Sequence, residues 1–135
     1  MSRAGYYDTE ASRYDETRGG EARAAAAAAA VLGLLPESAL RVVDVAGGTG
    51  IVGMRLGAPG RTVLSVDRSA GMSALAAARL PGHVVLGDAT RLPVADGSVD
   101  AVTMVWLLHL LDERRSAAAV AEAARVIGPG GTLLT

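Results

Sequence analysis

Short apolar runs alternate with helix-forming segments along most of this chain, and this alternation constrains the fold more than any other feature. Such runs, all but the last of them containing Val, lie at residues 40–46, 62–66, 83–86, 101–105 and 132–135. Segments of helical composition lie at residues 21–35, 49–56, 69–80 and 112–126. Uniformly apolar strands are typical of parallel sheets covered on both faces, and the crossovers between them are right-handed. The pattern therefore predicts an α/β fold with a doubly wound parallel sheet.

The composition indicates one domain with a core of small side chains. The chain has 135 residues, half of them hydrophobic, and contains no Phe. A chain of this length suits a single core, which must be built mainly from Ala, Val and Leu. The first twenty residues are polar and lack a clear period. We therefore expect residues 1–20 to form an N-terminal arm or lid and residues 21–135 to form the domain.

Charge and cysteine usage exclude several classes of partner. The formal net charge is −1, and 13 basic residues are dispersed among 14 acidic ones, so no basic face for nucleic acid is evident. The absence of Cys excludes disulfides and thiolate zinc sites. The apolar run at 24–35 is too short to span a bilayer. We expect a cytoplasmic protein with no metal and with neither nucleic acid nor membrane as a partner.

A glycine-rich turn follows the first predicted strand, in the sequence VVDVAGGTGIVG at residues 42–53. Gly47, Gly48 and Gly50 lack a Cβ, so their backbone can approach a ligand closely. In an open parallel sheet this junction is the usual ligand site. The part GTGIVG also fits G-x-G-x-x-G, with Asp67 at the spacing of a ribose-binding acid. A nicotinamide-dependent reductase and a ligand-free turn both remain alternatives.

Asp44 is unusual because it lies inside the first predicted strand. Burying a carboxylate there costs several kcal/mol unless the group is hydrogen-bonded or paired. A ligand ammonium group would provide such a partner. A structural cap on the glycine turn is the alternative.

Five segments from residue 44 onward, in order, and a short arm before them resemble class I S-adenosylmethionine-dependent methyltransferases. DVAGGTG at 44–50 is similar to motif I of that family, D-x-G-x-G-x-G, with Ala46 replacing a glycine. VDRSAGM, GDA followed by LPVADGSVDAV, MVWLLHLLDE and RVIGPGGTLL resemble its later segments, and YDETR at 14–18 resembles the Y-D-x-x-R arm of small-molecule methyltransferases. The resemblance implies a Rossmann-like sheet of order 3-2-1-4-5. Family strands 6 and 7 are missing, so we expect a chain truncated at its C-terminus.

The resemblance implies S-adenosylmethionine as cofactor and S-adenosylhomocysteine as product. Asp67 would accept hydrogen bonds from the ribose hydroxyls, Asp88 and the Ala89 N–H would contact the adenine edge, and Arg18 would approach the methionine carboxylate. Met72 would lie against the adenine ring, with core packing as its alternative. The complete set of implied cofactor-binding residues is Tyr14, Arg18, Asp44, Ala46, Gly47, Gly48, Gly50, Asp67, Arg68, Met72, Asp88, Ala89, Val105 and Trp106.

The implied reaction is methyl transfer to an O, N or C nucleophile of a small-molecule acceptor. His109 is the candidate base because imidazole titrates near neutral pH, and a histidine packed among leucines is its alternative. For the whole chain, the alternatives are an NAD(P)-dependent short-chain-type reductase and a non-catalytic S-adenosylmethionine-binding module. The unpaired edge of the fifth strand is a candidate homodimer interface.

Overall fold

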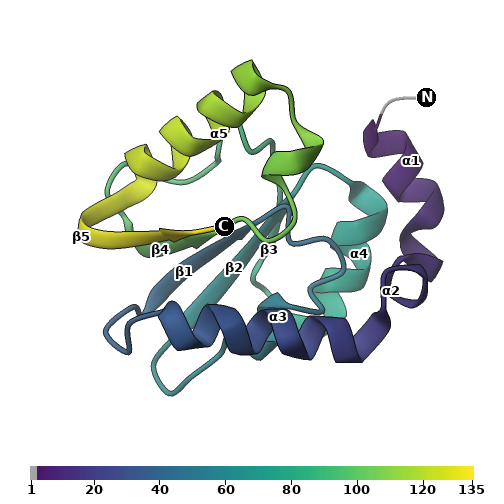
Figure 1. Ribbon diagram of the computed structural model, residues 1–135, viewed down its shortest axis with the longest axis horizontal. Coiled ribbons are helices and arrows are strands. Elements are labelled where there is room, and N and C mark those ends of the chain that lie inside the picture. The colour runs from purple at the N-terminus through teal and green to yellow at the C-terminus, as the bar shows by residue number, and fades with distance from the viewer. Residues whose placement is uncertain (1–2) are drawn as a thin grey trace.

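The computed structural model describes residues 3–135, and a parallel sheet forms its middle layer (Figure 1). The strands are β1 Arg41–Val45, β2 Thr62–Asp67, β3 Val84–Leu86, β4 Val99–Thr103 and β5 Ile127–Leu134. The α-helices are α1 Arg3–Glu10, α2 Tyr14–Thr17, α3 Gly20–Leu34, α4 Ala70–Arg79 and α5 Glu113–Val126. Short 3-10 turns lie at η1 Ala11–Arg13, η2 Gly53–Arg55 and η3 Leu108–Leu110.

The strand order is β3-β2-β1-β4-β5, and every pair is parallel. This order confirms the predicted fold class. Asp44 of β1 aligns with Ser65 of β2 and with Thr103 of β4, and Asp67 aligns with Leu86 of β3. The register therefore brings the polar ends of neighbouring strands to one edge of the sheet.

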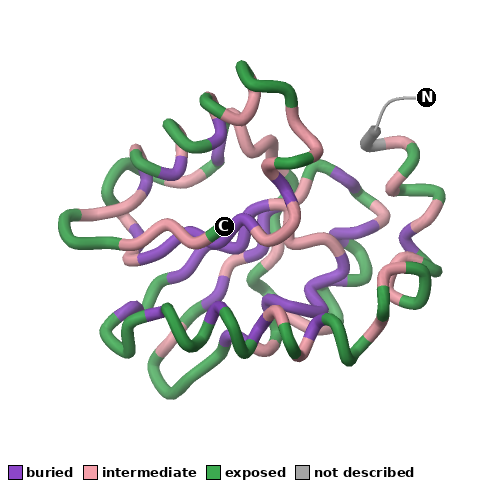
Figure 2. The backbone as a smooth tube through the Cα atoms, in the orientation of Figure 1, coloured by how far each residue is buried: buried purple, intermediate pink, exposed green. Residues whose placement is uncertain are grey.

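Two apolar clusters pack on the two faces of the sheet (Figure 2). On one face α3 covers β1, and the buried residues include Ala24, Ala28, Val31, Val42, Val63 and Ala101. On the other face α5 covers β1 and β4, and the buried residues include Val43, Val45, Val102, Ala119, Ala123 and Val126. Adjacent residues of β1 enter opposite clusters, as the strand period of two requires. The small side chains expected from the composition do form this core.

The helix boundaries follow ordinary capping chemistry. The Ser69 Oγ accepts a hydrogen bond from the Met72 N–H at 3.2 Å at the start of α4. Asp112 accepts one from the Arg115 N–H at 2.8 Å at the start of α5. At its end, α3 gives way to an extended residue immediately before Pro36, a conformation that proline favours in its predecessor. The predicted helices at 21–35, 69–80 and 112–126 are confirmed to within two residues at each end.

Three predicted segments differ from the structure. Residues 49–56 form turns and η2 instead of a helix, because Gly50 is left-handed with φ +78°. The fourth strand begins at Val99 and ends at Thr103, two residues earlier than predicted. The fifth strand begins already at Ile127, and the Gly-Pro-Gly-Gly segment is bulged within it, since the register with β4 shifts between Val99 and Ala101.

The segment at residues 88–98 has neither α-helix nor extended strand, yet α5 holds it in place. The Glu122 carboxylate accepts a hydrogen bond from the Leu92 N–H at 2.7 Å. The Arg125 guanidinium donates to the carbonyl oxygens of Leu92 at 3.0 Å and Val94 at 2.9 Å, and pairs with Asp96 at 2.6 Å. These bonds satisfy backbone groups of the loop that would otherwise lack partners.

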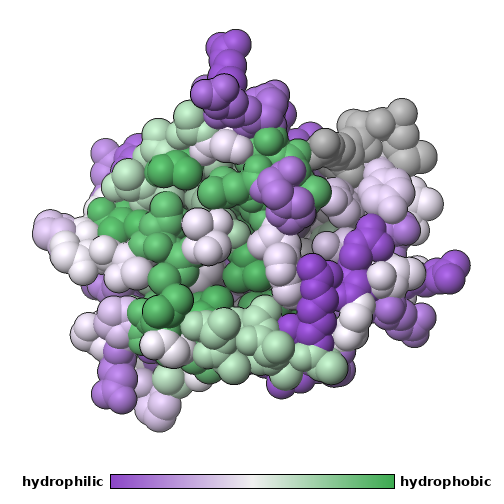
Figure 3. Space-filling model, in the orientation of Figure 1, coloured by the Kyte–Doolittle hydropathy of each residue, from purple (hydrophilic) through white to green (hydrophobic). Residues whose placement is uncertain are grey.

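Apolar side chains gather over the face between α3 and α5, beside the edge strand β5 (Figure 3). Leu32 and Leu34 of α3 and Val120 of α5 are exposed. An edge strand presents unpaired backbone groups to solvent. Within residues 3–135, no helix combines the length and the apolar character needed to cross a membrane.

Candidate functional site

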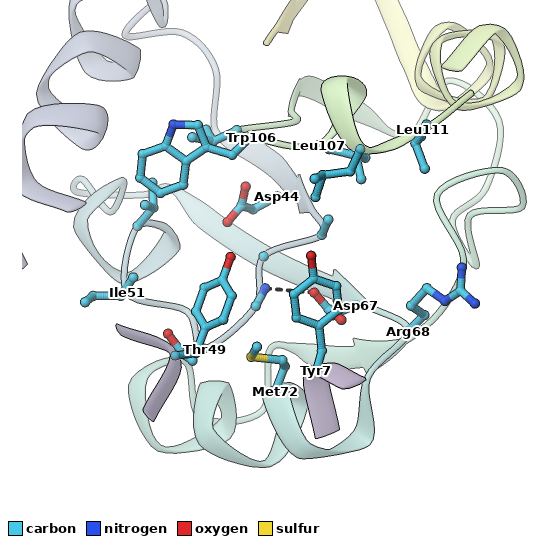
Figure 4. A pocket seen from close by; sticks show the side chains of 17 residues that line it. Tyr7, Asp44, Thr49, Ile51, Asp67, Arg68, Met72, Trp106, Leu107 and Leu111 are labelled. Carbon is cyan, nitrogen blue, oxygen red and sulfur yellow. Dashed lines mark hydrogen bonds between the residues drawn. The ribbon is translucent and has the colours of Figure 1, made fainter. Parts of the chain in front are cut away.

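A pocket opens at the carboxyl ends of β1, β2 and β4, and the N-terminal arm contributes part of its wall (Figure 4). The glycine turn, the start of α4 and the segment after β4 supply the rest. Its lining residues are Tyr7, Tyr14, Asp44, Ala46, Gly47, Gly48, Thr49, Ile51, Val52, Asp67, Arg68, Met72, Val105, Trp106, Leu107, Leu110 and Leu111. The pocket thus combines two acidic groups with a mostly apolar wall.

The glycine turn brings backbone close to the pocket without side chains in the way. Gly48 is left-handed with φ +59°, and so is Ala46 with φ +56°, although alanine disfavours that region. A Cβ added to Gly47 would overlap the Ser65 Oγ beneath it. The turn therefore requires glycine at position 47 and carries backbone strain at position 46.

Asp67 closes β2 and is held by backbone amides. Its carboxylate accepts hydrogen bonds from the Gly48 N–H and from the Ser69 N–H, both at 2.9 Å. The bond from Gly48 is the dashed line of Figure 4, and it joins the glycine turn to the end of the neighbouring strand. Burial raises the pKa of Asp67, and these amide hydrogen bonds oppose the rise.

Asp44 is 2% exposed and has a hydroxyl partner in the adjacent strand. The Thr103 Oγ1 donates a hydrogen bond to Asp44 Oδ1 at 2.7 Å. Burial raises the pKa of Asp44 to about 6, the Thr103 bond lowers it, and the negative charge of Asp67 raises it further. The carboxylate reaches the pocket, so a cationic ligand group would relieve the cost of its charge.

The arm lies against α4 and places aromatic rings over the pocket. Tyr7 and Tyr14 both line it, and their rings meet edge to face with centroids 5.8 Å apart. Burial raises the pKa of Tyr14. The Tyr7 ring enters the pocket that Asp67 also lines (Figure 4). The sequence analysis did not identify Tyr7, although the repeated Tyr-Asp pair at 7–8 and 14–15 was a signal that could have found it.

Most of the residues predicted to bind a cofactor converge on this pocket. Those that line it are Tyr14, Asp44, Ala46, Gly47, Gly48, Asp67, Arg68, Met72, Val105 and Trp106. Trp106 has a left-handed φ of +59°, and the Arg23 guanidinium lies 3.8 Å from its ring centroid. Sequence analysis also missed Thr49 and the apolar lining residues Ile51, Val52, Leu107, Leu110 and Leu111.

Four other predicted cofactor-binding residues lie outside the lining: Arg18, Gly50, Asp88 and Ala89. Arg18 pairs with Glu10 at 3.2 Å and lies over the Tyr14 ring at 5.0 Å. Asp88 accepts hydrogen bonds from the Thr90 N–H and hydroxyl, which help to lower its pKa against the effect of burial. The predicted cofactor roles of these residues stay predictions.

His109, the candidate base, is not brought to the pocket. It lies in η3 with an exposed side chain, while Leu107, Leu110 and Leu111 of the same segment line the cavity. The tight 3-10 turn directs neighbouring residues to different sides. The alternative of a histidine packed among leucines is therefore wrong, because the side chain is exposed. The base role of His109 stays a prediction.

The parallel sheet, its glycine turn and the acids at two strand ends define an α/β protein with a nucleoside-type cofactor site. Residues 43–135 match a family model described as a methyltransferase domain. The chain is 41% identical over 137 residues to a demethylmenaquinone methyltransferase of Beutenbergia cavernae, covering 97% of this chain and 55% of that protein. It is 43% identical over 101 residues to an uncharacterized methyltransferase of Mycobacterium tuberculosis, covering 74% of this chain and 40% of that protein.

Solved structures agree with these relatives. A Thermotoga maritima SAM-dependent methyltransferase, described as a possible histamine N-methyltransferase, matches 94% of this chain and 57% of its own, with TM-score 0.77 and 29% identity. A SAM-bound amino pentose methyltransferase of Micromonospora echinaspora matches 84% of this chain and 48% of its own, with TM-score 0.65 and 32% identity.

The chain belongs to the methyltransferase domain family, within the class I S-adenosylmethionine-dependent methyltransferases. This membership favours S-adenosylmethionine over the nicotinamide cofactor that the glycine turn left open. The chain spans about half the length of the curated relatives it matches.

Proposed function

We propose that this chain binds S-adenosylmethionine in the pocket and that the protein transfers its methyl group to a small-molecule acceptor. The observation that carries the proposal is the Asp67 carboxylate, which lies at the end of β2 and lines the pocket beside the glycine turn. An ionised carboxylate has two oxygens with several acceptor positions, so it can serve a vicinal diol while keeping its amide bonds. The ribose of the cofactor carries such a diol.

The turn and the strand ends fit the rest of the cofactor. The space beside Gly48 is open, since a Cβ added there would meet no heavy atom within 4 Å. The buried Asp44 carboxylate suits the ammonium group of the methionine moiety. Met72 lines the pocket and offers a polarizable surface to the adenine ring. Asp88 would accept a hydrogen bond from the exocyclic amine at the rim.

When bound, the cofactor supplies a methyl group activated by a sulfonium leaving group. The protein's part is to position the reactants and exclude water. Tyr7 and Tyr14 of the arm and Trp106 after β4 are the aromatic residues that would do so. Among the described residues the pocket lining contains no histidine, so an acceptor whose nucleophile needs no histidine base fits this site.

The part of the pocket where we expect the methyl acceptor to bind suits an apolar ring. Trp106, Leu107, Leu110 and Leu111 form a continuous apolar stretch of the lining. Relatives are named as a demethylmenaquinone methyltransferase and as a ubiquinone/menaquinone biosynthesis C-methyltransferase. We extend this by proposing a quinol-type acceptor with a carbon nucleophile. A homodimer through the β5 edge and a cytoplasmic location stay predictions.

Calorimetric titration of the 135-residue chain with S-adenosylhomocysteine tests cofactor binding, with NADH as the comparison ligand. Asp67→Asn should weaken S-adenosylhomocysteine binding by roughly 10- to 100-fold, because hydrogen bonds to a charged group contribute about 1.5–3 kcal/mol. Circular dichroism checks that both proteins are folded. A folded wild-type chain that binds NADH and not S-adenosylhomocysteine would refute the proposal.

Turnover is measured separately with S-adenosylmethionine and a reduced naphthoquinone that lacks the ring methyl group. Methylated product at a rate above the cofactor-only control supports the enzyme. Cofactor binding without transfer to this acceptor counts against the quinol-type acceptor and favours the non-catalytic binding module.

A further inference from the structure

The arm carries the dipeptide Tyr-Asp twice, at residues 7–8 and 14–15. The two copies make the same kinds of contact. In each copy the tyrosine lines the pocket. In each copy the aspartate side chain is bonded to α4 or to a residue beside it. The arm is therefore attached to the domain at two points, and each point is next to a ring that covers the pocket.

Asp8 is attached at the first turn of α4. Its Oδ1 accepts a hydrogen bond from the Ser69 Oγ at 2.5 Å and another from the Gly71 N–H at 2.8 Å. The free amides at a helix N-terminus favour a carboxylate there. Ser69 already caps the helix by accepting from the Met72 N–H, so α4 does not depend on Asp8 for its cap.

Asp15 is attached at the other end of the same helix. Its carboxylate accepts a hydrogen bond from the Thr49 Oγ1 at 2.6 Å and pairs with the Arg79 guanidinium at 2.9 Å. Arg79 also donates to the Thr49 carbonyl oxygen at 2.9 Å. This second attachment joins the arm to the glycine turn as well as to α4.

Gly71 shows how closely the arm lies on the helix. A Cβ added to Gly71 would be 3.0 Å from the Cα and from the carbonyl oxygen of Asp8, and 3.3 Å from the Ala11 Cβ. Backbone atoms cannot move aside as a flexible side chain can. A methyl group at position 71 would therefore push this part of the arm outward.

We propose that Asp8 is a positioning residue for the cofactor: its bonds to Ser69 and Gly71 hold the Tyr7 ring over the pocket and slow cofactor release. This rests on the proposed function of the same pocket. Tyr7 contacts Tyr14 edge to face and lines the same pocket as Asp67, the residue beside which the ribose would lie. The alternative is that Asp8 only stabilises the fold.

Release of S-adenosylhomocysteine from the preloaded chain is the decisive measurement. Trp106 lines the pocket and is the chain's single tryptophan, so its fluorescence reports release directly in a stopped-flow dilution. Asp8→Ala should release the ligand about tenfold faster, the effect of about one hydrogen bond to a charged group. Asp8→Asn keeps an oxygen acceptor and should restore most of the slow release. Glu16→Ala removes an exposed carboxylate of the same arm and should leave release unchanged.

Two further variants separate positioning from stability. Gly71→Ala favours the helix but displaces the arm, so it should speed release without lowering the melting temperature. In a Tyr7→Ala background, Asp8→Ala should change release by less than twofold, because the ring it holds is gone.

If the wild type binds and both Asp8→Ala and Gly71→Ala release the ligand at the wild-type rate, the positioning role is wrong while the proposed function stands. An unchanged effect of Asp8→Ala in the Tyr7→Ala background also overturns it. If the folded wild type binds no S-adenosylhomocysteine, the proposed function itself fails, and this inference with it.

Discussion

Replacing Asp44 by Asn should make the unliganded protein more stable at neutral pH and less able to bind its cofactor. The Asn amide has nearly the size of the carboxylate, and its oxygen can still accept the hydrogen bond from Thr103. The substitution removes the charge and turns the second carboxylate oxygen into an NH2 donor, which faces the pocket side of the strand end. Because Asp44 is buried, that charge is the costly part of the residue in the absence of a ligand.

The size of the effect follows from the pKa of Asp44, which burial raises from 3.8 to about 6. Each pKa unit corresponds to about 1.4 kcal/mol, so ionised Asp44 lowers the free energy of unfolding by about 3 kcal/mol. Well below pH 3.8 the group is protonated in both the folded and the unfolded state and costs nothing. The cost develops as pH rises from about 4 to about 6 and is complete above that. The stability advantage of the Asn variant should therefore be small near pH 4, about 1 kcal/mol at pH 4.5, and close to its full size near pH 7.

Urea unfolding of both proteins at pH 4.5 and pH 7, followed by Trp106 fluorescence, measures this difference. Glu16→Gln, an exposed substitution, is the matched control and should show no comparable change with pH. An Asn variant that is less stable than the wild type at pH 7 would refute the reasoning. It would mean that partners of the carboxylate outweigh its burial. Calorimetry at pH 7 should show weaker S-adenosylhomocysteine binding by the same variant.

Three other predictions concern the glycine turn and the exposed histidine. Ala46→Gly should raise the free energy of unfolding by about 0.5–1 kcal/mol, because relief of a strain of about 1–2 kcal/mol exceeds the added freedom of the unfolded glycine; a less stable variant in urea would contradict this. Gly47→Ala should lower the free energy of unfolding by about 1–3 kcal/mol, because the added Cβ would overlap the Ser65 Oγ. Adding Ser65→Ala should restore much of that loss, since the Ser65 Oγ has no hydrogen-bond partner among the described residues. A double-mutant cycle without coupling would exclude that explanation. His109→Ala should change ligand affinity and the rate of methyl transfer by less than twofold. A tenfold loss of the transfer rate would instead support a role of His109 as base.

The sheet was predictable because its strands carry a strong local signal. Short apolar runs identified the five strands, the first three of them followed by glycine or Asp, and their alternation with Ala-rich segments indicated parallel pairing. The segment 49–56 was predicted wrongly because its helical composition is overridden by left-handed Gly50. The early start of β5 was missed because Gly-Pro-Gly-Gly is normally a turn, and only pairing with β4 makes it part of a strand.

The site was predictable where a residue ends a strand and not where it depends on distant contacts. Asp44 and Asp67 converge because the carboxyl ends of parallel strands share one edge. Tyr7 lines the pocket, and its neighbour Asp8 is bonded to residues more than sixty positions away, a contact that the local sequence does not reveal. The exposure of His109 depends on how the 3-10 turn is rotated, which apolar neighbours in the sequence do not reveal.

The bonds from Glu122 and Arg125 to the segment 88–98 have a consequence for evolution of the site. Asp88, the predicted adenine contact, begins a segment whose shape is set by two side chains on the far end of a helix. Substitutions at 122 or 125 would therefore change nucleobase recognition while every pocket-lining residue stays the same. Variants sought by changing the lining alone would never sample that route.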